Sequence, residues 1–136
     1  MRTAIYPGSF NPWHLGHQDV LEKALKVFDK VVIMQGNNLS KATEKDQSFM
    51  DLIHRYPNVA VGHFTGLLAD HIASHNYDAV IRGLRNGNDL DYEVNLQYWN
   101  EDLGVDIPFV HFITDRKYIH ISSSAIREVE AIRNKP

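Results

Sequence analysis

Two histidines stand three positions apart near the start of the chain, in the stretch GSFNPWHLGH that runs from Gly8 to His17. Imidazoles at i and i+3, here His14 and His17, can project from the same side of the first turn of a helix. Gly8 and Gly16 let the backbone approach a ligand, because a Cβ at either position would occupy the ligand's space. The stretch could therefore offer an anion donors from side chains and from backbone N–H groups. The alternatives are a turn shaped by prolines whose histidines cap a helix at the surface, and a zinc site, which would need a third ligand.

A second cluster lies in IRGLRNGNDLDYEVNLQYWN, where Arg82 and Arg85 flank a glycine. Two guanidinium forks in one loop fit phosphate oxygens. The alternative is an exposed loop in which the arginines pair with Asp89, Asp91 and Glu93 as a solvated charge cluster.

A third cluster is YIHISSSAIRE, in which three serines, 122–124, precede a run with helical spacing. Serines at this place are typical of a helix N-cap, and they gather hydroxyl and N–H groups at the positive end of the helix. Capping needs one serine, so the other two could bind an anion, although a serine-rich helix start without a ligand is equally compatible. Lys41, in the polar segment NNLSK, is a further cation that would ordinarily be solvated.

The elements that must position these clusters follow from the apolar pattern. Five short runs rich in β-branched residues predict strands buried on both faces, at residues 3–6, 31–34, 59–61, 79–81 and 109–113. Apolar residues recur with helical spacing over 17–28 and more weakly over 67–75, and a short helix is expected around 46–54.

Strands alternate with helices along the whole chain, which predicts right-handed crossovers and an α/β fold. We expect a single doubly wound, Rossmann-like domain over residues 1–136, with a five-stranded parallel sheet flanked by helices. Such sheets bind ligands beyond the carboxyl ends of their strands, near the point where the strand order reverses. The three clusters are therefore expected to converge there.

Composition narrows the class of protein. The chain has 136 residues, 43% of them hydrophobic, and a net charge of −3, so no whole-surface field would attract nucleic acid or an acidic membrane. It has no cysteine, which excludes disulfides and thiolate metal sites. Because no apolar run is long enough for a signal peptide or a membrane span, a cytoplasmic protein is expected.

Three motifs give the chain a family resemblance. HLGH in a strand–loop–helix setting resembles the HxGH motif of the nucleotidyltransferase superfamily, and YPGSFNPWHLGH resembles the opening of the bacterial phosphopantetheine adenylyltransferases, commonly YPGSFDPxTxGH. RGLR followed by D-x-x-Y-E and a later Asn, and then ISSSxxR-E, are similar to two further motifs of that family, in the same order. The chain departs from the pattern at Asn11, at His14 and in a shorter segment over 41–56. Relatives are also expected to continue beyond the position of Pro136, so the domain is short at the C-terminus relative to the family.

The resemblance implies adenylyl transfer from ATP to 4′-phosphopantetheine, giving dephospho-coenzyme A and pyrophosphate in coenzyme A biosynthesis. It implies Mg²⁺ bound mainly through the nucleotide phosphates without a protein metal site, and a homohexamer. The catalytic residues it implies are His14, His17, Lys41 and Arg85. Those implied for ATP are Ser9, Phe10, His17, Gly83, Leu84, Arg85, Glu93, Tyr118, Ile119, His120, Ile121, Ser122, Ser123 and Ser124. Those implied for the acceptor are Ser9, Lys41, Leu68, Arg82, Tyr92, Asn100 and Glu128.

Two other hypotheses stay open. A related nucleotidyltransferase could use another phosphorylated acceptor, as glycerol-3-phosphate cytidylyltransferase or nicotinate mononucleotide adenylyltransferase does; HLGH slightly favours this, whereas RGLR and ISSS argue against it. A nucleotide-binding paralogue without turnover is the second, and the joint presence of His17, Lys41, Arg82 and Arg85 argues against it.

The remaining histidines give weaker signals. His71 and His75 lie at i and i+4 on an expected helix, but HIASH lacks the Glu of a metalloprotease HExxH motif, so a surface pair is expected. His111 alternates with apolar neighbours in the last expected strand, which predicts a hydrogen-bonded residue in the core or at the edge of a pocket.

Overall fold

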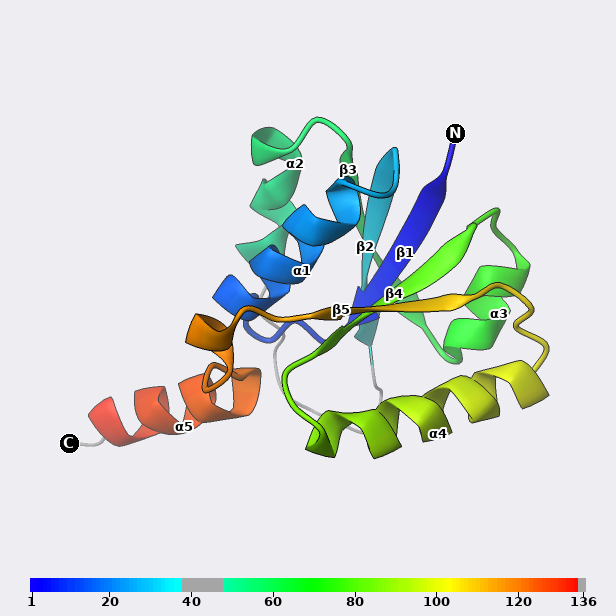
Figure 1. Ribbon diagram of the computed structural model, residues 1–136. Coiled ribbons are helices and arrows are strands. Elements are labelled where there is room, and N and C mark those ends of the chain that lie inside the picture. The colour runs from blue at the N-terminus through cyan, green and yellow to red at the C-terminus, as the bar shows by residue number, and fades with distance from the viewer. Residues whose placement is uncertain (38–47, 135–136) are drawn as a thin grey trace.

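Five parallel strands form one sheet in the order β3-β2-β1-β4-β5, as the computed structural model in Figure 1 shows. The structure describes residues 1–37 and 48–134. The strands are β1 (Thr3–Gly8), β2 (Lys30–Asn37), β3 (Val59–Thr65), β4 (Ala79–Leu84) and β5 (Phe109–Ile113). All five predicted strands are confirmed. The first four extend beyond their apolar runs, because backbone pairing continues past the last buried side chains.

The helices within the described ranges are α1 (Leu15–Leu25), α2 (Leu52–Arg55), α3 (Leu68–Ala73), α4 (Asn88–Asp102) and α5 (Ser123–Arg133), with 3₁₀ turns at Ser48–Asp51 and Arg116–Tyr118. The short helix expected around 46–54 is a 3₁₀ turn that continues into α2; residues 46 and 47 lie outside the described part. The expected helix over 17–28 starts earlier and ends at Leu25, and Phe28 reaches the core from the turn that follows.

The strand order places β1 and β4 side by side in the middle of the sheet, although β2 and β3 lie between them in sequence. From β1 the chain winds outward to β2 and β3, and it then returns to β4 and winds the other way to β5. The reversal between β1 and β4 is the switch point expected from the alternating pattern, and it confirms the doubly wound α/β fold.

Helices cover both faces of the sheet (Figure 1). Side chains of α1 and α2 pack with Ala4 and Tyr6 of β1 on one face, and Ile5 packs with side chains of α3 on the other. Consecutive residues of a strand point to opposite faces, so a strand buried on both faces must be apolar at every position. Ile5 has no accessible surface, and burying such a side chain stabilises the fold by about 1.5–3 kcal/mol.

Helix α4 is the element that the apolar pattern does not reveal. Its buried residues are both polar, Glu93 and Asn100, which lie seven positions apart on one stripe. Several of its large apolar side chains are exposed, among them Tyr98 and Trp99. The helix therefore lacks the apolar stripe by which amphipathic helices are recognised. Within the described ranges, no helix combines the length and the apolar character needed to cross a membrane.

Candidate active site

A cavity of about 260 Å³ opens at the carboxyl ends of β1 and β4, at the switch point of the sheet. The loop after β1, the first turns of α1, the end of β4 and the segment after β5 all contribute to its wall. Its described lining consists of Tyr6, Pro7, Gly8, Ser9, Phe10, His14, Gly16, His17, Val20, Arg82, Gly83, Arg85, Thr114, Ile121 and Ser122. The expectation that the three sequence clusters converge at this edge is confirmed.

The two histidines form the N-terminal cap of α1. His14 is the N-cap residue, and its Nδ1 accepts a hydrogen bond from the backbone N–H of Gly16 at 3.1 Å. In return, Nδ1 of His17 accepts one from the backbone N–H of His14 at 3.2 Å. A ring nitrogen that accepts a hydrogen bond carries no proton, so each neutral ring has its proton on Nε2. The histidines therefore cap the helix, as one of the alternatives from the sequence predicts, but they do so only through their Nδ1 atoms. Their two Nε2–H groups remain as donors in the wall of the cavity.

Aromatic rings enclose His17. Its ring centroid lies 5.0 Å from that of Phe10 and 5.2 Å from that of Trp13, and the ring of His14 stacks on it at 3.7 Å. Burial in this cluster, together with the neighbouring His14, Arg82 and Arg85, holds the pKa of His17 well below its usual 6.5. Burial and the charge of Arg85 lower the pKa of His14 to about 4. Both imidazoles are therefore neutral near pH 7.

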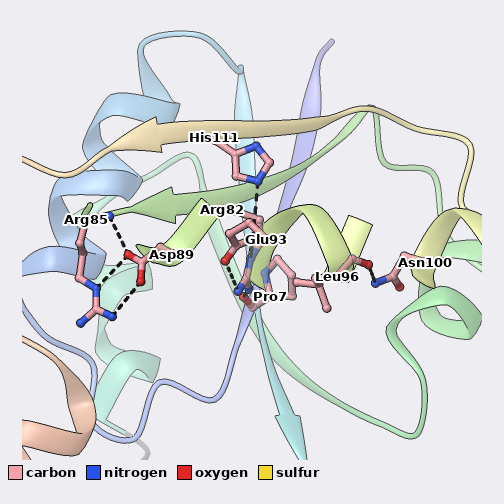
Figure 2. A network of polar contacts seen from close by, with 8 residues as sticks. All are labelled: Pro7, Arg82, Arg85, Asp89, Glu93, Leu96, Asn100 and His111. Atoms are coloured by element: carbon pink, nitrogen blue, oxygen red, sulfur yellow. Dashed lines mark hydrogen bonds and ion pairs between the residues drawn. The ribbon is translucent and has the colours of Figure 1, made fainter. Parts of the chain in front are cut away.

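Arg82 is held in place at the end of β4 (Figure 2). Its Nε and Nη2 donate to the two carboxylate oxygens of Glu93, each at 2.8 Å, and its Nη1 donates to the carbonyl of Pro7 at 3.1 Å. Glu93 is only 4% exposed. A buried bidentate pair of this kind fixes the plane of the guanidinium against the end of β1.

Arg85 is held more loosely. Its Nε and Nη2 lie 3.3 and 3.2 Å from the two carboxylate oxygens of Asp89, and Asp89 also accepts from the backbone N–H of Arg85 at 2.9 Å. The pairing of arginines with acidic residues, expected as the alternative for this cluster, does occur. It does not form a solvated cluster, however, because Glu93 is buried and both arginines line the cavity.

Side chains of helix α5 form hydrogen bonds with the loop that carries the histidines. The hydroxyl of Ser122 accepts from the backbone N–H of Ala125 at 3.1 Å and caps the helix, as expected for a serine at this position. Ser123 donates its hydroxyl hydrogen to the carbonyl of Pro12 at 2.9 Å. Arg127 donates from Nη1 to the carbonyl of Asn11. The third sequence cluster thus reaches the first through two side-chain contacts more than a hundred residues apart in sequence.

Gly8 has a steric role in the same loop. A Cβ at this position would lie 2.9 Å from ring carbons of Phe10, closer than real side chains approach. Phe10 itself is 2% exposed and has a φ of 45°, so its ring cannot move aside without disturbing both the backbone and the core. Only glycine fits at position 8.

The site residues expected from the sequence divide into two groups. Those that line the cavity are Ser9, Phe10, His14, His17, Arg82, Gly83, Arg85, Ile121 and Ser122. Those described residues that are not part of its lining are Leu68, Leu84, Tyr92, Glu93, Asn100, Tyr118, Ile119, His120, Ser123, Ser124 and Glu128. Lys41 lies outside the described residues. Roles in ligand binding for both groups stay predictions.

Three residues of the second group, all expected to bind the acceptor, lie elsewhere. Leu68 packs against the core cluster that contains Ile5. The buried side chain of Asn100 donates to the carbonyl of Leu96 at 2.8 Å, whereas Tyr92 is largely exposed on α4. The structure does not bring these residues to the cavity.

Sequence reasoning missed several residues that shape the cavity, among them Thr114 and Gln35. Thr114, which is almost fully buried, follows β5 directly and lines the wall. Its place at the carboxyl end of a predicted strand was the signal that could have identified it. Gln35, on β2, has no accessible surface and donates from Nε2 to the carbonyl of Ser9 at 2.7 Å. A polar residue at the end of an apolar run gave no comparable signal.

The donors of the cavity fit a polyanion. Imidazole N–H groups and two guanidinium groups line it, and no Asp or Glu is part of its described lining. Mg²⁺ prefers oxygen ligands, above all carboxylates and phosphates. The side-chain oxygens present are the hydroxyls of Tyr6, Ser9, Thr114 and Ser122. Such a wall suits a magnesium ion that arrives with phosphate ligands of its own.

Known proteins resemble this chain over almost its whole length. The family model described as "Cytidylyltransferase-like" matches residues 5–129. Phosphopantetheine adenylyltransferase of Syntrophomonas wolfei is 38% identical over 133 residues, which cover 94% of this chain and 83% of that protein. The enzyme of the same name from Clostridium perfringens is 35% identical over 140 residues, covering 99% of this chain and 85% of that protein.

Two solved structures share the fold. One is a bifunctional NMN adenylyltransferase/ADP ribose pyrophosphatase from Francisella tularensis, with a TM-score of 0.62 at 14% identity over 94% of this chain and 41% of that chain. The other is the lipopolysaccharide core biosynthesis protein from Thermoplasma volcanium, with a TM-score of 0.59 at 22% identity over 85% of this chain and 98% of that chain. At these identities the likeness concerns the fold alone.

Proposed function

Because this chain belongs to the cytidylyltransferase-like family, and within it to the phosphopantetheine adenylyltransferases, we propose that it transfers the adenylyl group of ATP to 4′-phosphopantetheine. The products are dephospho-coenzyme A and pyrophosphate. The single observation that carries the proposal is the convergence of two imidazole Nε2–H donors, two arginines and the start of α5 on one cavity.

This reaction requires that the two substrates be positioned, and it requires no general base. A phosphate of the acceptor attacks the α-phosphorus of ATP, and because this phosphate is already an anion, no proton has to be removed from it. The protein must hold two polyanions in line, although they repel each other, and must stabilise the charge that develops on the five-coordinate phosphorus. A wall of fixed N–H donors meets both demands.

His17 is assigned to the α-phosphate. Its Nδ1 is tied to the backbone, so its Nε2–H donor has a fixed direction and needs no reorganisation when charge develops on the phosphate oxygens. His14 has the same arrangement and supports the same phosphates. Arg85 and the N-terminal end of α5 at Ser122 are assigned to the departing pyrophosphate, because a guanidinium and a helix N-terminus both favour anions.

Arg82 and Ser9 are assigned to the phosphate of the acceptor, together with Lys41. Support for Arg82 comes from its place in the wall beside β1, where Glu93 and Pro7 fix its orientation. Family resemblance assigns two further sets of residues. The set for the pantetheine arm is Leu68, Tyr92, Asn100 and Glu128. The set for ATP is Leu84, Tyr118, Ile119, His120, Ser123 and Ser124.

Magnesium is proposed as the metal cofactor, held mainly by the phosphates of the nucleotide. When bound, it would neutralise part of the phosphate charge. The hydroxyls of Tyr6, Ser9, Thr114 and Ser122 are the side-chain oxygens that the described wall could offer to such an ion or to its water ligands.

The acceptor is tested by comparing ligands. A thermal-shift panel with ATP, CTP, phosphopantetheine and dephospho-coenzyme A should show the largest stabilisation with dephospho-coenzyme A or with ATP, since a ligand that binds only the folded state raises its apparent stability. Pyrophosphate release should then require ATP together with phosphopantetheine. Release with CTP and glycerol 3-phosphate, or with ATP and nicotinate mononucleotide, would instead identify one of the related transferases. Binding of ATP without turnover for any acceptor would identify a paralogue that only binds nucleotides.

A homohexamer is proposed for the assembly. Its support in this chain is the set of exposed apolar side chains on α4: Leu90, Tyr92, Tyr98 and Trp99 are each at least half exposed. Burying such side chains between copies would remove apolar area from water. Sedimentation velocity distinguishes a hexamer from smaller assemblies.

A further inference from the structure

His111 on β5 lies directly opposite Arg82 on β4 in the register of the two strands. Side chains of paired residues in neighbouring strands project from the same face of the sheet. Helix α4 packs on that face and brings Glu93 between them, as Figure 2 shows. The Nε2 atom of His111 lies 3.6 Å from Oε2 of Glu93, slightly beyond hydrogen-bond distance.

The sequence predicts a hydrogen-bonded His111, but its buried Nε2 atom has no hydrogen-bond partner among the described residues. Buried polar atoms nearly always have a partner, so an exception needs an explanation. The acceptor that faces it is Oε2 of Glu93. A carboxylate oxygen has two lone pairs, so Oε2 can accept from the Nε of Arg82 and from a second donor at once.

Arg82 still has donors to offer. A guanidinium has five N–H groups, and Arg82 uses three of them, two on Glu93 and one on the carbonyl of Pro7. Two N–H groups are left, and Arg82 lines the cavity. A phosphate that takes these two groups pulls the guanidinium toward the cavity and weakens its hold on Glu93, which then needs another donor.

We propose that His111 is a positioning residue that acts on the acceptor phosphate through Glu93 and Arg82. Its Nε2–H group supplies the additional donor to Glu93, so that Arg82 keeps its orientation while it binds phosphate. Contacts of this kind are commonly long without ligand and shorten in the substrate complex. The inference rests on the proposed function, because that function assigns Arg82 to the phosphate of the acceptor.

Steady-state kinetics of His111→Leu, His111→Gln and the wild type test this role. His111→Leu removes the donor, and we expect the KM for phosphopantetheine to rise about tenfold, the loss of one hydrogen bond to a charged group, while kcat changes less than about twofold. His111→Gln retains an N–H donor and should recover most of the affinity. His63→Leu, an exposed histidine of β3, is the matched control and should leave both constants unchanged. An unchanged KM in His111→Leu, or a Gln variant no better than Leu, would overturn the proposal.

A second measurement does not depend on turnover. With saturating inorganic phosphate, the ¹H–¹⁵N signal of the Arg82 Nε–H group, assigned by its disappearance in Arg82→Lys, should exchange with water faster in His111→Leu than in the wild type. If it does not, the positioning role is wrong even where the enzyme is active. If the wild type shows no turnover with ATP and phosphopantetheine, the proposed function is wrong, and the exchange rate alone still decides on His111. Should His111→Leu fail to fold, the bulkier His111→Phe replaces it in both measurements.

Discussion

The backbone N–H of His14 donates to Nδ1 of His17 at 3.2 Å, and this contact determines which nitrogen of His17 carries the proton. With Nδ1 occupied as an acceptor, the neutral ring has its hydrogen on Nε2. The low pKa of His17, caused by burial and nearby cations, keeps the ring neutral near pH 7. The helix cap is therefore also a device that orients a catalytic donor, since the same bond that begins α1 fixes the tautomer.

Replacing His17 tests that role. We expect His17→Ala to lower the turnover of the adenylyl transfer by about 10² or more, the effect of losing one preorganised donor at a developing oxyanion. The free energy of unfolding should fall by only about 0.5–2 kcal/mol, because half of the capping box remains on His14. A pyrophosphate-release assay and urea unfolding measure the two effects. His54→Ala, at an exposed position of α2, is the control, and near-wild-type turnover of His17→Ala would contradict the assignment.

The depressed pKa of His14 predicts how stability depends on pH. Its pKa is about 4 in the folded protein and near 6.5 in the unfolded chain, so between these values the unfolded state binds more protons. Stability must then decrease as the pH falls from 6.5 toward 4. In His14→Asn the cap is retained, because Asn is a good N-cap residue, but the titrating group is gone. Thermal unfolding between pH 4 and 7 should show a shallower decrease of Tm in this variant, with a remainder due to His17; an identical slope would contradict the prediction.

The sequence was sufficient for those features that follow from periodicity. Buried parallel strands are apolar throughout, and each of the five was visible as a short run; their alternation with helices then located the switch point where His17, Arg82 and Ser122 meet. Thr114 could have been found by the same rule, because it directly follows β5.

Contacts between side chains that lie far apart in the sequence could not be predicted from the sequence alone. The sequence left open whether Arg82 and Arg85 pair with acidic residues or line a site, and in the structure they do both. Which acid meets which arginine depends on how α4 rotates about its axis, and α4 has no apolar stripe that would fix this rotation from sequence alone. Its orientation is instead set by burying Glu93 against Arg82, a pairing that only the assembled sheet defines.

The close approach of β4 to α1 gives a prediction about packing. A Cβ on Gly83 would lie 2.8 Å from Cγ2 of Val20, a side chain that is itself almost fully buried. Gly83→Ala should therefore lower the free energy of unfolding by about 1–3 kcal/mol, since the core has no room for the added methyl group. Val20→Ala should lower it by about 2 kcal/mol through lost burial and the space left behind.

The double variant Gly83→Ala, Val20→Ala decides whether this contact is the cause. Removing Cγ2 makes room for the new methyl group, so the double variant should be more stable than the sum of the single effects predicts, by about 1 kcal/mol. Urea unfolding of all four proteins at pH 7 gives the cycle. Simple additivity would mean that Gly83→Ala acts elsewhere, for example on the backbone of β4.

The serines at the start of α5 have different partners and should behave differently. Ser122 caps its own helix through Ala125, whereas Ser123 holds the carbonyl of Pro12 in the histidine loop. Ser122→Ala should lower the free energy of unfolding by about 1 kcal/mol and should speed amide exchange in the first turn of α5. Ser123→Ala leaves the cap intact and removes one partly buried hydrogen bond, worth about 0.5–1.5 kcal/mol, so exchange should accelerate in the loop between β1 and α1 instead.

Hydrogen exchange resolved by residue separates these two outcomes, because the affected amides lie at opposite ends of the sequence. Arg127→Lys provides a comparison for the loop, since Arg127 also donates to it, through the carbonyl of Asn11. A lysine keeps the charge but has a different donor geometry, so exchange in the histidine loop should again accelerate while the cap of α5 stays protected. Acceleration confined to α5 in both Ser123→Ala and Arg127→Lys would mean that the helix does not hold the loop. The orientation of His14 and His17 would then depend on the capping box of α1 alone.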